Sequence, residues 1–183
     1  IVKSLEKKYG IKYLIEAYEN LYTKYQGLYK GKKLRLLIGG SGQEEAALKE
    51  QVAGLESRES IRFLGRVQPD VIVATYNSCD ICVFPSLREG FGVSAIESQA
   101  CQVPVIITRV GGHPESVEEG QTGLIVESKS AETLLAAMDK LMTDDDMRLA
   151  MGKKARDFVV STYRFEDNFE DISKLYDMVL ENR

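Results

Sequence analysis

Two glutamates, Glu89 and Glu97, flank the glycine-rich sequence Gly90-Phe91-Gly92, and this arrangement could serve a phosphorylated ligand. An apolar run that ends at Phe84 precedes the glycines, and a helix is expected to begin near Gly92. The first N–H groups of a helix have no acceptor within it, so they bind anions such as a diphosphate. Glu97 would lie about five residues, or roughly 7 Å, along the helix axis. One ligand could therefore place its phosphates at the helix start and a ribose beside Glu97.

The two carboxylates are also open to other interpretations. Isolated glutamates are usually surface residues, and a pair of carboxylates can act as the acid and base of a glycosidase. The glycines between them, directly after a buried strand, favour a ligand-binding loop over a plain surface. A helix N-terminus contributes only about 0.3–1 kcal/mol to the binding of an exposed anion. A diphosphate would therefore need a nearby Arg or Lys as well.

Two further glycine-rich loops follow predicted strands. Gly39-Gly40-Ser41-Gly42 is similar to a dinucleotide fingerprint, but that pattern needs Gly or Ala at position 45, where Glu45 would repel a pyrophosphate. We therefore expect a tight strand-to-helix turn there and no NAD. The other loop, 108–115, contains His113, the only histidine, with no carboxylate or nucleophile partner evident in the sequence. We expect a loop histidine rather than a catalytic base.

Cysteine and aspartate clusters supply the remaining candidate metal ligands. Cys79 and Cys82 form a CxxC pattern, which is typical of zinc and redox sites. Cys82 lies inside an apolar run, however, and a zinc site would also need the third cysteine and the histidine to converge, so we expect buried structural cysteines. Thr143 is expected to cap a helix, and Asp144-Asp145-Asp146 would form its first turn. Carboxylates are favourable there because the N-terminal end of a helix is positive. We predict no metal site.

Alternating strands and helices would position these loops. Short apolar runs typical of buried parallel strands cover 34–38, 61–64, 81–84, 103–108 and 124–126. Amphipathic helices are expected over 10–25, after Gly42, from Pro69, from the N-cap Ser130, after Thr143, and along Phe169, Ile172, Tyr176 and Val179. The alternation predicts an α/β fold, a Rossmann-like doubly wound parallel sheet, in which ligands bind at the carboxyl ends of the strands.

Length and composition restrict the class of protein. The chain has 183 residues, enough for one domain, and begins at Ile1 without a Met, as if cut from a longer chain. Its net charge of −4 argues against a nucleic-acid partner, which requires a clustered basic face. No window approaches the roughly 20 apolar residues of a transmembrane helix, and no secretory signal is visible. Three cysteines without such a signal are typical of the cytoplasm.

In their order along the chain, these motifs resemble those of family 4 retaining glycosyltransferases. They are the segment from Glu89 to Glu97, Gln99-Ala100-Cys101-Gln102-Val103-Pro104, Gly111-Gly112-x-x-Glu115 and Gly120-x-x-Gly123. The resemblance covers essentially all of residues 1–183 and implies the C-terminal, donor-binding half of the two-domain GT-B architecture, with the N-terminal acceptor domain absent. It implies a nucleotide diphosphate sugar as donor substrate, with UDP or GDP as the nucleotide, and neither a cofactor nor a metal.

The resemblance also implies a role for each matching position. Glu89 would be the catalytic contact to the sugar hydroxyls, and Glu97 would bind the ribose diol. The other implied donor contacts are Gly90, Phe91 and Gly92, whose N–H groups would face the sugar, Val93 and Ser94, whose N–H groups would face the diphosphate, and Arg66 and Val67, which would contact the base.

The sequence departs from the family at the Arg and Lys that bind the diphosphate. Those two positions fall on Ser4 and Tyr9, so a neighbouring lysine would have to substitute, because a flexible ammonium can reach a phosphate from several backbone positions. We name Lys7 and Lys8 as donor-binding residues, with Lys3 as an alternative.

The activity implied is transfer of a sugar with retention at its anomeric carbon. The acceptor, a glycan or a lipid-linked sugar, would bind the absent N-terminal domain, so this chain alone should bind donor and transfer nothing. The expected location is the cytoplasm, with peripheral contact at the inner face of the membrane through the absent domain. Two alternatives stay open: a sugar-nucleotide epimerase of similar architecture, and a non-catalytic nucleotide-binding module.

Overall fold

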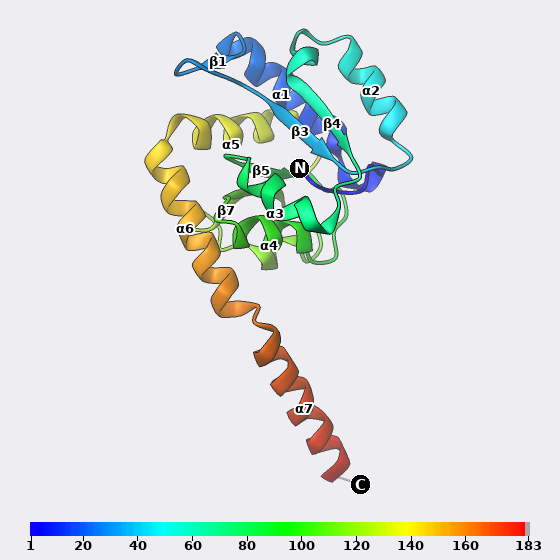
Figure 1. The fold of residues 1–183 in the computed structure, drawn as a ribbon, viewed down its shortest axis with the longest axis vertical. Coiled ribbons are helices and arrows are strands. Elements are labelled where there is room, and N and C mark those ends of the chain that lie inside the picture. Colours follow the sequence, from blue (N-terminus) through cyan, green and yellow to red (C-terminus); the bar gives the residue numbers. More distant parts are fainter. Residues whose placement is uncertain (182–183) are drawn as a thin grey trace.

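The computed structural model describes residues 1–181, except for the side chains of 165–168, 170, 171 and 181. Strands and helices alternate along the chain, as the apolar runs predicted (Figure 1). The strands are β1 (Leu28–Tyr29), β2 (Lys32–Lys33), β3 (Leu36–Gly39), β4 (Ile61–Gly65), β5 (Cys82–Phe84), β6 (Val105–Thr108) and β7 (Gly123–Val126). The α-helices are α1 (Ile11–Tyr25), α2 (Glu45–Ala53), α3 (Pro69–Asn77), α4 (Val93–Ala100), α5 (Ala131–Thr143), α6 (Asp145–Thr162) and α7 (Phe165–Glu181).

The five predicted strands are present and parallel, but they form two ladders. β3 pairs with β4, and β5, β6 and β7 pair in that order. Within the described residues no ladder joins β3 to β5, so the parallel strands of the predicted Rossmann-like fold are grouped in two hydrogen-bonded ladders. The N-terminal segment pairs with β3 instead: Val2 forms a parallel bridge with Gly39, and the Ile1 ammonium donates to the Leu37 carbonyl oxygen at 3.1 Å.

Helices pack around these ladders and bury a continuous apolar core. α1 packs against α5, and α4 packs against α6. The largest fully buried aliphatic side chains come from the N-terminal segment, α1, two strands and α5: Leu5, Leu14, Ile15, Ile38, Ile106, Ile107, Leu134 and Leu141. Because β5 and β6 are buried along their whole length, the loops that leave their carboxyl ends start from a rigid base.

One helix boundary differs from the sequence prediction, and two short elements add to the fold. Ser130 caps α5 as expected, but Thr143 does not cap the next helix: its hydroxyl donates to the Asp139 carbonyl oxygen at 2.8 Å inside α5, a bond that threonine often makes in helices. Asp144 is the cap of α6 and accepts from the Met147 N–H at 2.8 Å. The glycines of the 108–115 loop are followed by a single 3₁₀ turn, His113–Ser116, because the backbone becomes extended at Val117. The short β1–β2 hairpin was not predicted.

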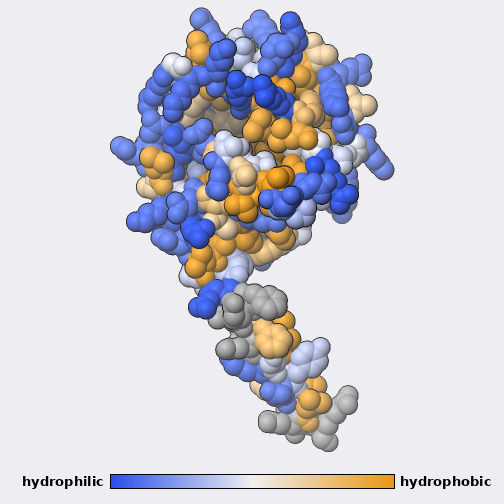
Figure 2. Space-filling model, in the orientation of Figure 1, coloured by the Kyte–Doolittle hydropathy of each residue, from blue (hydrophilic) through white to orange (hydrophobic). Residues whose placement is uncertain are grey.

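The last helix, α7, extends away from the body of the molecule (Figures 1 and 2). The predicted apolar positions do line it, yet they are exposed: Phe169, Ile172, Tyr176 and Val179 each keep more than half of their surface accessible. Among residues 1–181, none of the helices combines the length and the apolar character that crossing a bilayer requires.

Candidate functional site

The start of α4 presents backbone donors to solvent. Gly92 is the N-cap, and the N–H groups of Ala95 and Ile96 already bond to its carbonyl oxygen. No side chain caps this end of the helix, so the N–H groups of Val93 and Ser94, which precede the first intrahelical bonds, are open to an external acceptor. The helix thus begins where the sequence predicted, and free N–H groups of this kind bind anions, so an anion site here stays a prediction.

Gly92 allows this geometry because of its conformation and its neighbour. Its φ of 102° lies in the region that L side chains rarely adopt, and a Cβ there would lie 2.6 Å from Cδ2 of His113. The bend can therefore pack directly on the histidine ring only with glycine at this position.

Glu89 is held in place by an ion pair. Its Oε2 atom lies 2.8 Å from Nζ of Lys3 and accepts a hydrogen bond of 3.3 Å from the Ser86 hydroxyl. Only 11% of the Glu89 side chain is exposed. This partial burial raises the carboxyl pKa, but the bond and the charge of Lys3 outweigh it, so the pKa of Glu89 lies below its usual value. The residue is a carboxylate at neutral pH.

Glu97 is oriented by a tyrosine from the preceding helix. The Tyr76 hydroxyl, at the end of α3, donates to Oε2 of Glu97 at 3.0 Å. Tyr76 is fully buried, and burial together with the Glu97 charge raises its pKa, so it stays a neutral donor. A carboxylate has two acceptor oxygens, so Glu97 can accept a further hydrogen bond while Tyr76 holds it.

Side chains distant in the sequence support the bend through ring contacts and a hydrogen bond. The Phe91 ring meets the Tyr163 ring edge to face at 5.5 Å, and Tyr163 meets Phe158 at 5.7 Å. The Thr108 hydroxyl, at the end of β6, donates to the Ser86 carbonyl oxygen at 2.6 Å. Sequence reasoning missed these supports because no local pattern connects the bend to the end of α6.

His113 lies in the connection between β6 and β7, as expected of a loop histidine, but it is buried. It is 1% exposed, and its Nδ1 atom has no hydrogen-bond partner. Burial lowers its pKa to about 4, against the opposing charge of Glu89. The neutral ring therefore supports the start of α4 and does not serve as a proton carrier near pH 7.

The other predicted donor contacts lie at different depths. Val67 packs on the glycine loop after β3, since a Cβ on Gly39 would lie 2.7 Å from its Cγ2, whereas Arg66 is exposed. Lys7 and Lys8 are exposed, and Lys8 forms an ion pair of 2.9 Å with Glu6. Within the described residues, Lys3 is the lysine that forms an ion pair with Glu89.

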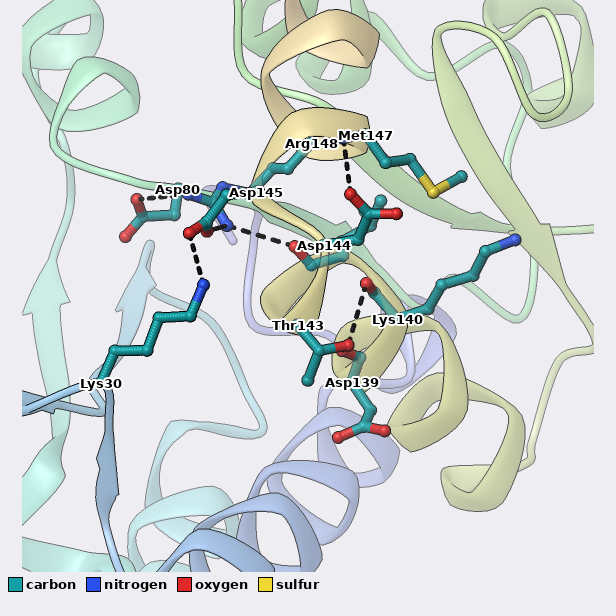
Figure 3. Close-up of polar contacts among 10 residues, drawn as sticks. Lys30, Asp80, Asp139, Lys140, Thr143, Asp144, Asp145, Met147 and Arg148 are labelled. Atoms are coloured by element: carbon teal, nitrogen blue, oxygen red, sulfur yellow. Dashed lines mark hydrogen bonds and ion pairs between the residues drawn. The ribbon is translucent and has the colours of Figure 1, made fainter.

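Two aspartates of the acidic run, Asp144 and Asp145, act in helix capping and ion pairs (Figure 3). Asp145 binds Lys30 at 2.7 Å and Arg148 at 2.6 Å, and these two bonds lower its pKa to about 2. Asp144 is occupied as the α6 cap. Among residues 1–181, no three His, Cys, Asp or Glu side chains gather to hold a metal ion.

The CxxC cysteines differ in burial. Cys82 is buried in β5, as expected, whereas Cys79 is half-buried. A hydrogen bond from Cys82 lowers the pKa of Cys79 below its usual value. The prediction of buried structural cysteines thus holds for Cys82 and not for Cys79.

A cavity of about 340 Å³ opens at the other end of the strands. It lies between the beginnings of β3 and β5, with Leu36, Val83 and Met138 in its wall and the Asp145 ion pairs at its rim. None of the predicted donor contacts lines it. The cavity is therefore separate from the α4 site, which lies at the carboxyl ends of the strands, where ligands bind in α/β folds of this kind.

A parallel α/β fold with a glycine bend leading into α4 is that of the C-terminal, Rossmann-like half of a GT-B glycosyltransferase. The chain belongs to the family described as glycosyl transferases group 1, whose model matches residues 1–158. The resemblance and the fold class predicted from the motifs are thereby confirmed.

Individual relatives agree with this assignment. A D-inositol 3-phosphate glycosyltransferase from Corynebacterium jeikeium is 36% identical over 139 residues, which are 76% of this chain and 33% of that protein. The capsular polysaccharide biosynthesis glycosyltransferase CapM from Staphylococcus aureus is 30% identical over 180 residues, 98% of this chain and 45% of that protein. The chain thus spans less than half the length of these relatives.

Solved structures give the same picture. The C-terminal domain of the group 1 glycosyl transferase LpcC from Francisella tularensis matches with a TM-score of 0.77 and 26% identity, over 88% of this chain and 83% of that one. HepE from Anabaena, solved with UDP-glucose, matches with a TM-score of 0.85 over 97% of this chain and 47% of that one. At 19% identity, the match to HepE shows the fold alone.

Proposed function

We propose that this chain binds the nucleotide diphosphate sugar donor of a retaining, metal-independent glycosyltransferase. The observation that carries the proposal is the uncapped start of α4, which lies between two glutamates that the fold holds in place. One glutamate precedes the helix and the other lies within it, so a ligand with its diphosphate at the helix start has a carboxylate on either side. UDP is the first nucleotide to test, because HepE, which shares the fold, was solved with UDP-glucose.

Each contact has a physical role in this proposal. Glu89 is the catalytic contact to the sugar hydroxyls, because it is ionised and close to the bend. Glu97, fixed by Tyr76, accepts from the ribose. The backbone N–H groups of Gly90, Phe91 and Gly92 face the sugar, those of Val93 and Ser94 face the diphosphate, and Arg66 and Val67 border the base.

Charge neutralisation at the leaving group is what this half contributes to the reaction. The bond from the anomeric carbon to the diphosphate oxygen breaks, and negative charge grows on that oxygen. Preorganised N–H donors stabilise such charge more in the transition state than in the ground state, which lowers the barrier. A nearby lysine adds the full positive charge that the helix end lacks, so the proposed chemistry needs no metal ion.

The acceptor belongs to the remainder of the full-length enzyme. The chain covers 33% to 45% of the two relatives above, which leaves room for a second domain in each. We assign residues 1–183 to the donor domain and place the acceptor, a glycan or a lipid-linked sugar, on the other. This chain alone should therefore bind donor without transferring sugar.

Calorimetric titration of this chain with UDP, GDP and ADP, and with uridine, guanosine and adenosine, tests the proposal. At least one diphosphate should bind at least tenfold more tightly than its nucleoside, because the start of α4 recognises phosphate. Glu97→Ala should weaken the preferred nucleotide about tenfold, the value of one hydrogen bond to a charged group. The control is Glu59→Ala, whose side chain is 90% exposed and should be neutral.

Two outcomes would contradict donor binding at this site. One is that none of the three diphosphates binds more tightly than its own nucleoside. The other is an unchanged affinity in Glu97→Ala. For the full-length enzyme, conversion of free donor without an acceptor would support an epimerase instead.

A further inference from the structure

Lys3 lies in an unusual environment for a lysine. Its side chain is 12% exposed, and its Nζ atom lies 2.8 Å from Oε2 of Glu89 and 4.7 Å from the centre of the Tyr9 ring. Most lysines keep their ammonium groups in water, because burying a charge is costly without a partner. Here the carboxylate and the aromatic face replace that water. The structure therefore places one cation beside the bend.

The backbone fixes Lys3 in this position. Its N–H donates to the Gly39 carbonyl oxygen at 2.9 Å, and two residues on, Leu5 N–H donates to the Ser41 carbonyl oxygen at 2.9 Å. Gly40, with a φ of 134°, lies so close that a Cβ there would collide with the Lys3 carbonyl oxygen. The glycine loop after β3 thus serves to dock the segment that carries Lys3, rather than to bind a dinucleotide itself.

The ammonium group also lies near the start of α4. The His113 ring contacts Gly92, the α4 cap. Burial is the main cause that lowers the pKa of His113, and the Lys3 charge acts in the same direction, whereas the Glu89 charge opposes it. Because both charges act on the ring that touches Gly92, these four residues form one group around the exposed N–H donors.

We infer that Lys3 is the cation that binds the donor diphosphate, and that Glu89 holds its ammonium group until the donor arrives. This inference rests on the proposed function. When a sugar nucleotide binds, the Lys3 ammonium group forms an ion pair with the diphosphate, and the Glu89 carboxylate accepts hydrogen bonds from the sugar hydroxyls. Each member of the Lys3–Glu89 pair thus exchanges one partner for another. Tyr9, in contact with Lys3, guides the ammonium group during the exchange.

The exchange has a consequence that a merely structural ion pair lacks. UDP without a sugar draws Lys3 away from Glu89 but offers Glu89 no hydroxyl to bind. The lost ion pair is then not compensated, so it opposes UDP binding. A UDP-sugar satisfies both groups. Removing the charge of Glu89 should therefore strengthen binding of UDP and weaken binding of UDP-glucose.

The test is calorimetry on this chain with uridine, UDP and UDP-glucose. Lys3→Met should weaken UDP about tenfold and leave uridine unchanged, and Lys3→Arg should retain most of the UDP affinity. Glu89→Gln should bind UDP about two- to fivefold more tightly, the range of a partly exposed ion pair, and UDP-glucose more weakly. Lys12→Met is the matched control, because Lys12 also lies over a tyrosine ring, at 4.9 Å, but is exposed.

Other results would overturn the assignment. A loss of UDP affinity in Lys7→Met or Lys8→Met, with none in Lys3→Met, would transfer the role to those lysines. Weaker UDP binding by Glu89→Gln would contradict the exchange. Circular dichroism and urea midpoints identify variants that fail to fold. If Lys3→Met is one of them, the UDP affinity of Lys3→Arg is compared with that of the wild type instead. If the wild-type chain binds UDP no better than uridine, and neither GDP nor ADP better, the proposed function itself fails.

Discussion

Replacing Gly92 by alanine should destabilise the chain through two separable effects. The first is conformational: an L side chain at a φ of 102° costs roughly 1–2 kcal/mol, as in other left-handed positions. The second is steric, because the new Cβ would lie 2.6 Å from Cδ2 of His113, whose ring is 1% exposed and cannot turn into solvent. Overpacking of this kind costs about 1–3 kcal/mol. We expect the free energy of unfolding to fall by about 2–5 kcal/mol, a large share of the stability of a typical domain.

A double-mutant cycle with His113→Ala separates the two effects. Urea denaturation would give the free energy of unfolding for the wild type, both single variants and the double variant. Without the ring, Gly92→Ala should cost only its conformational part, so the cycle should show a coupling of about 1–3 kcal/mol. The reasoning is refuted if Gly92→Ala leaves stability within about 0.5 kcal/mol of the wild type, or if its cost is the same in both backgrounds.

Three further predictions concern the supports of the site and of the fold. Tyr76→Phe should weaken UDP binding several-fold at little cost in stability, because Glu97 loses the hydroxyl that orients it; equal calorimetric affinities would refute that role. The pKa of His113 is about 4 in the folded chain, so the stability from its neutral form should be complete above about pH 6.5 and should fall, by up to about 3 kcal/mol, as pH drops toward 4. Urea midpoints measured from pH 7 to 4 should fall less steeply in His113→Gln, and parallel curves would count against burial of the ring as the cause. Asp144→Ala should cost about 1 kcal/mol of thermal stability as a lost cap, with Thr143→Ala costing less; the reverse order would return the cap to Thr143.

Local features of the fold could be predicted from the sequence, because they depend on neighbouring residues. Buried strands such as 81–84 form continuous apolar runs, and the α4 start follows from glycines placed after such a run. The choice between Thr143 and Asp144 as a cap could not be made, because adjacent residues of both types are suitable caps. The break between the two ladders has no local signal either, since it depends on which strand edges meet.

Long-range contacts account for what the sequence could not show at the site. The Phe91 ring packs on Tyr163, and Glu97 accepts a hydrogen bond from Tyr76, although the sequence spacing of neither pair predicts a contact. The residue resemblance indicated that a lysine must replace the usual diphosphate cations, but only the fold brings Lys3 beside Glu89. The burial of His113 was not expected, because nothing in the sequence around a single loop histidine shows what packs on it.

Amide chemical shifts of this chain, recorded by NMR during titration with UDP, test most directly that phosphate binds at the start of α4. The largest shifts should fall on the N–H groups of Val93 and Ser94, and uridine should leave those two signals in place. Shifts confined to the cavity between β3 and β5, or two signals that stay fixed at saturating UDP, would contradict the account.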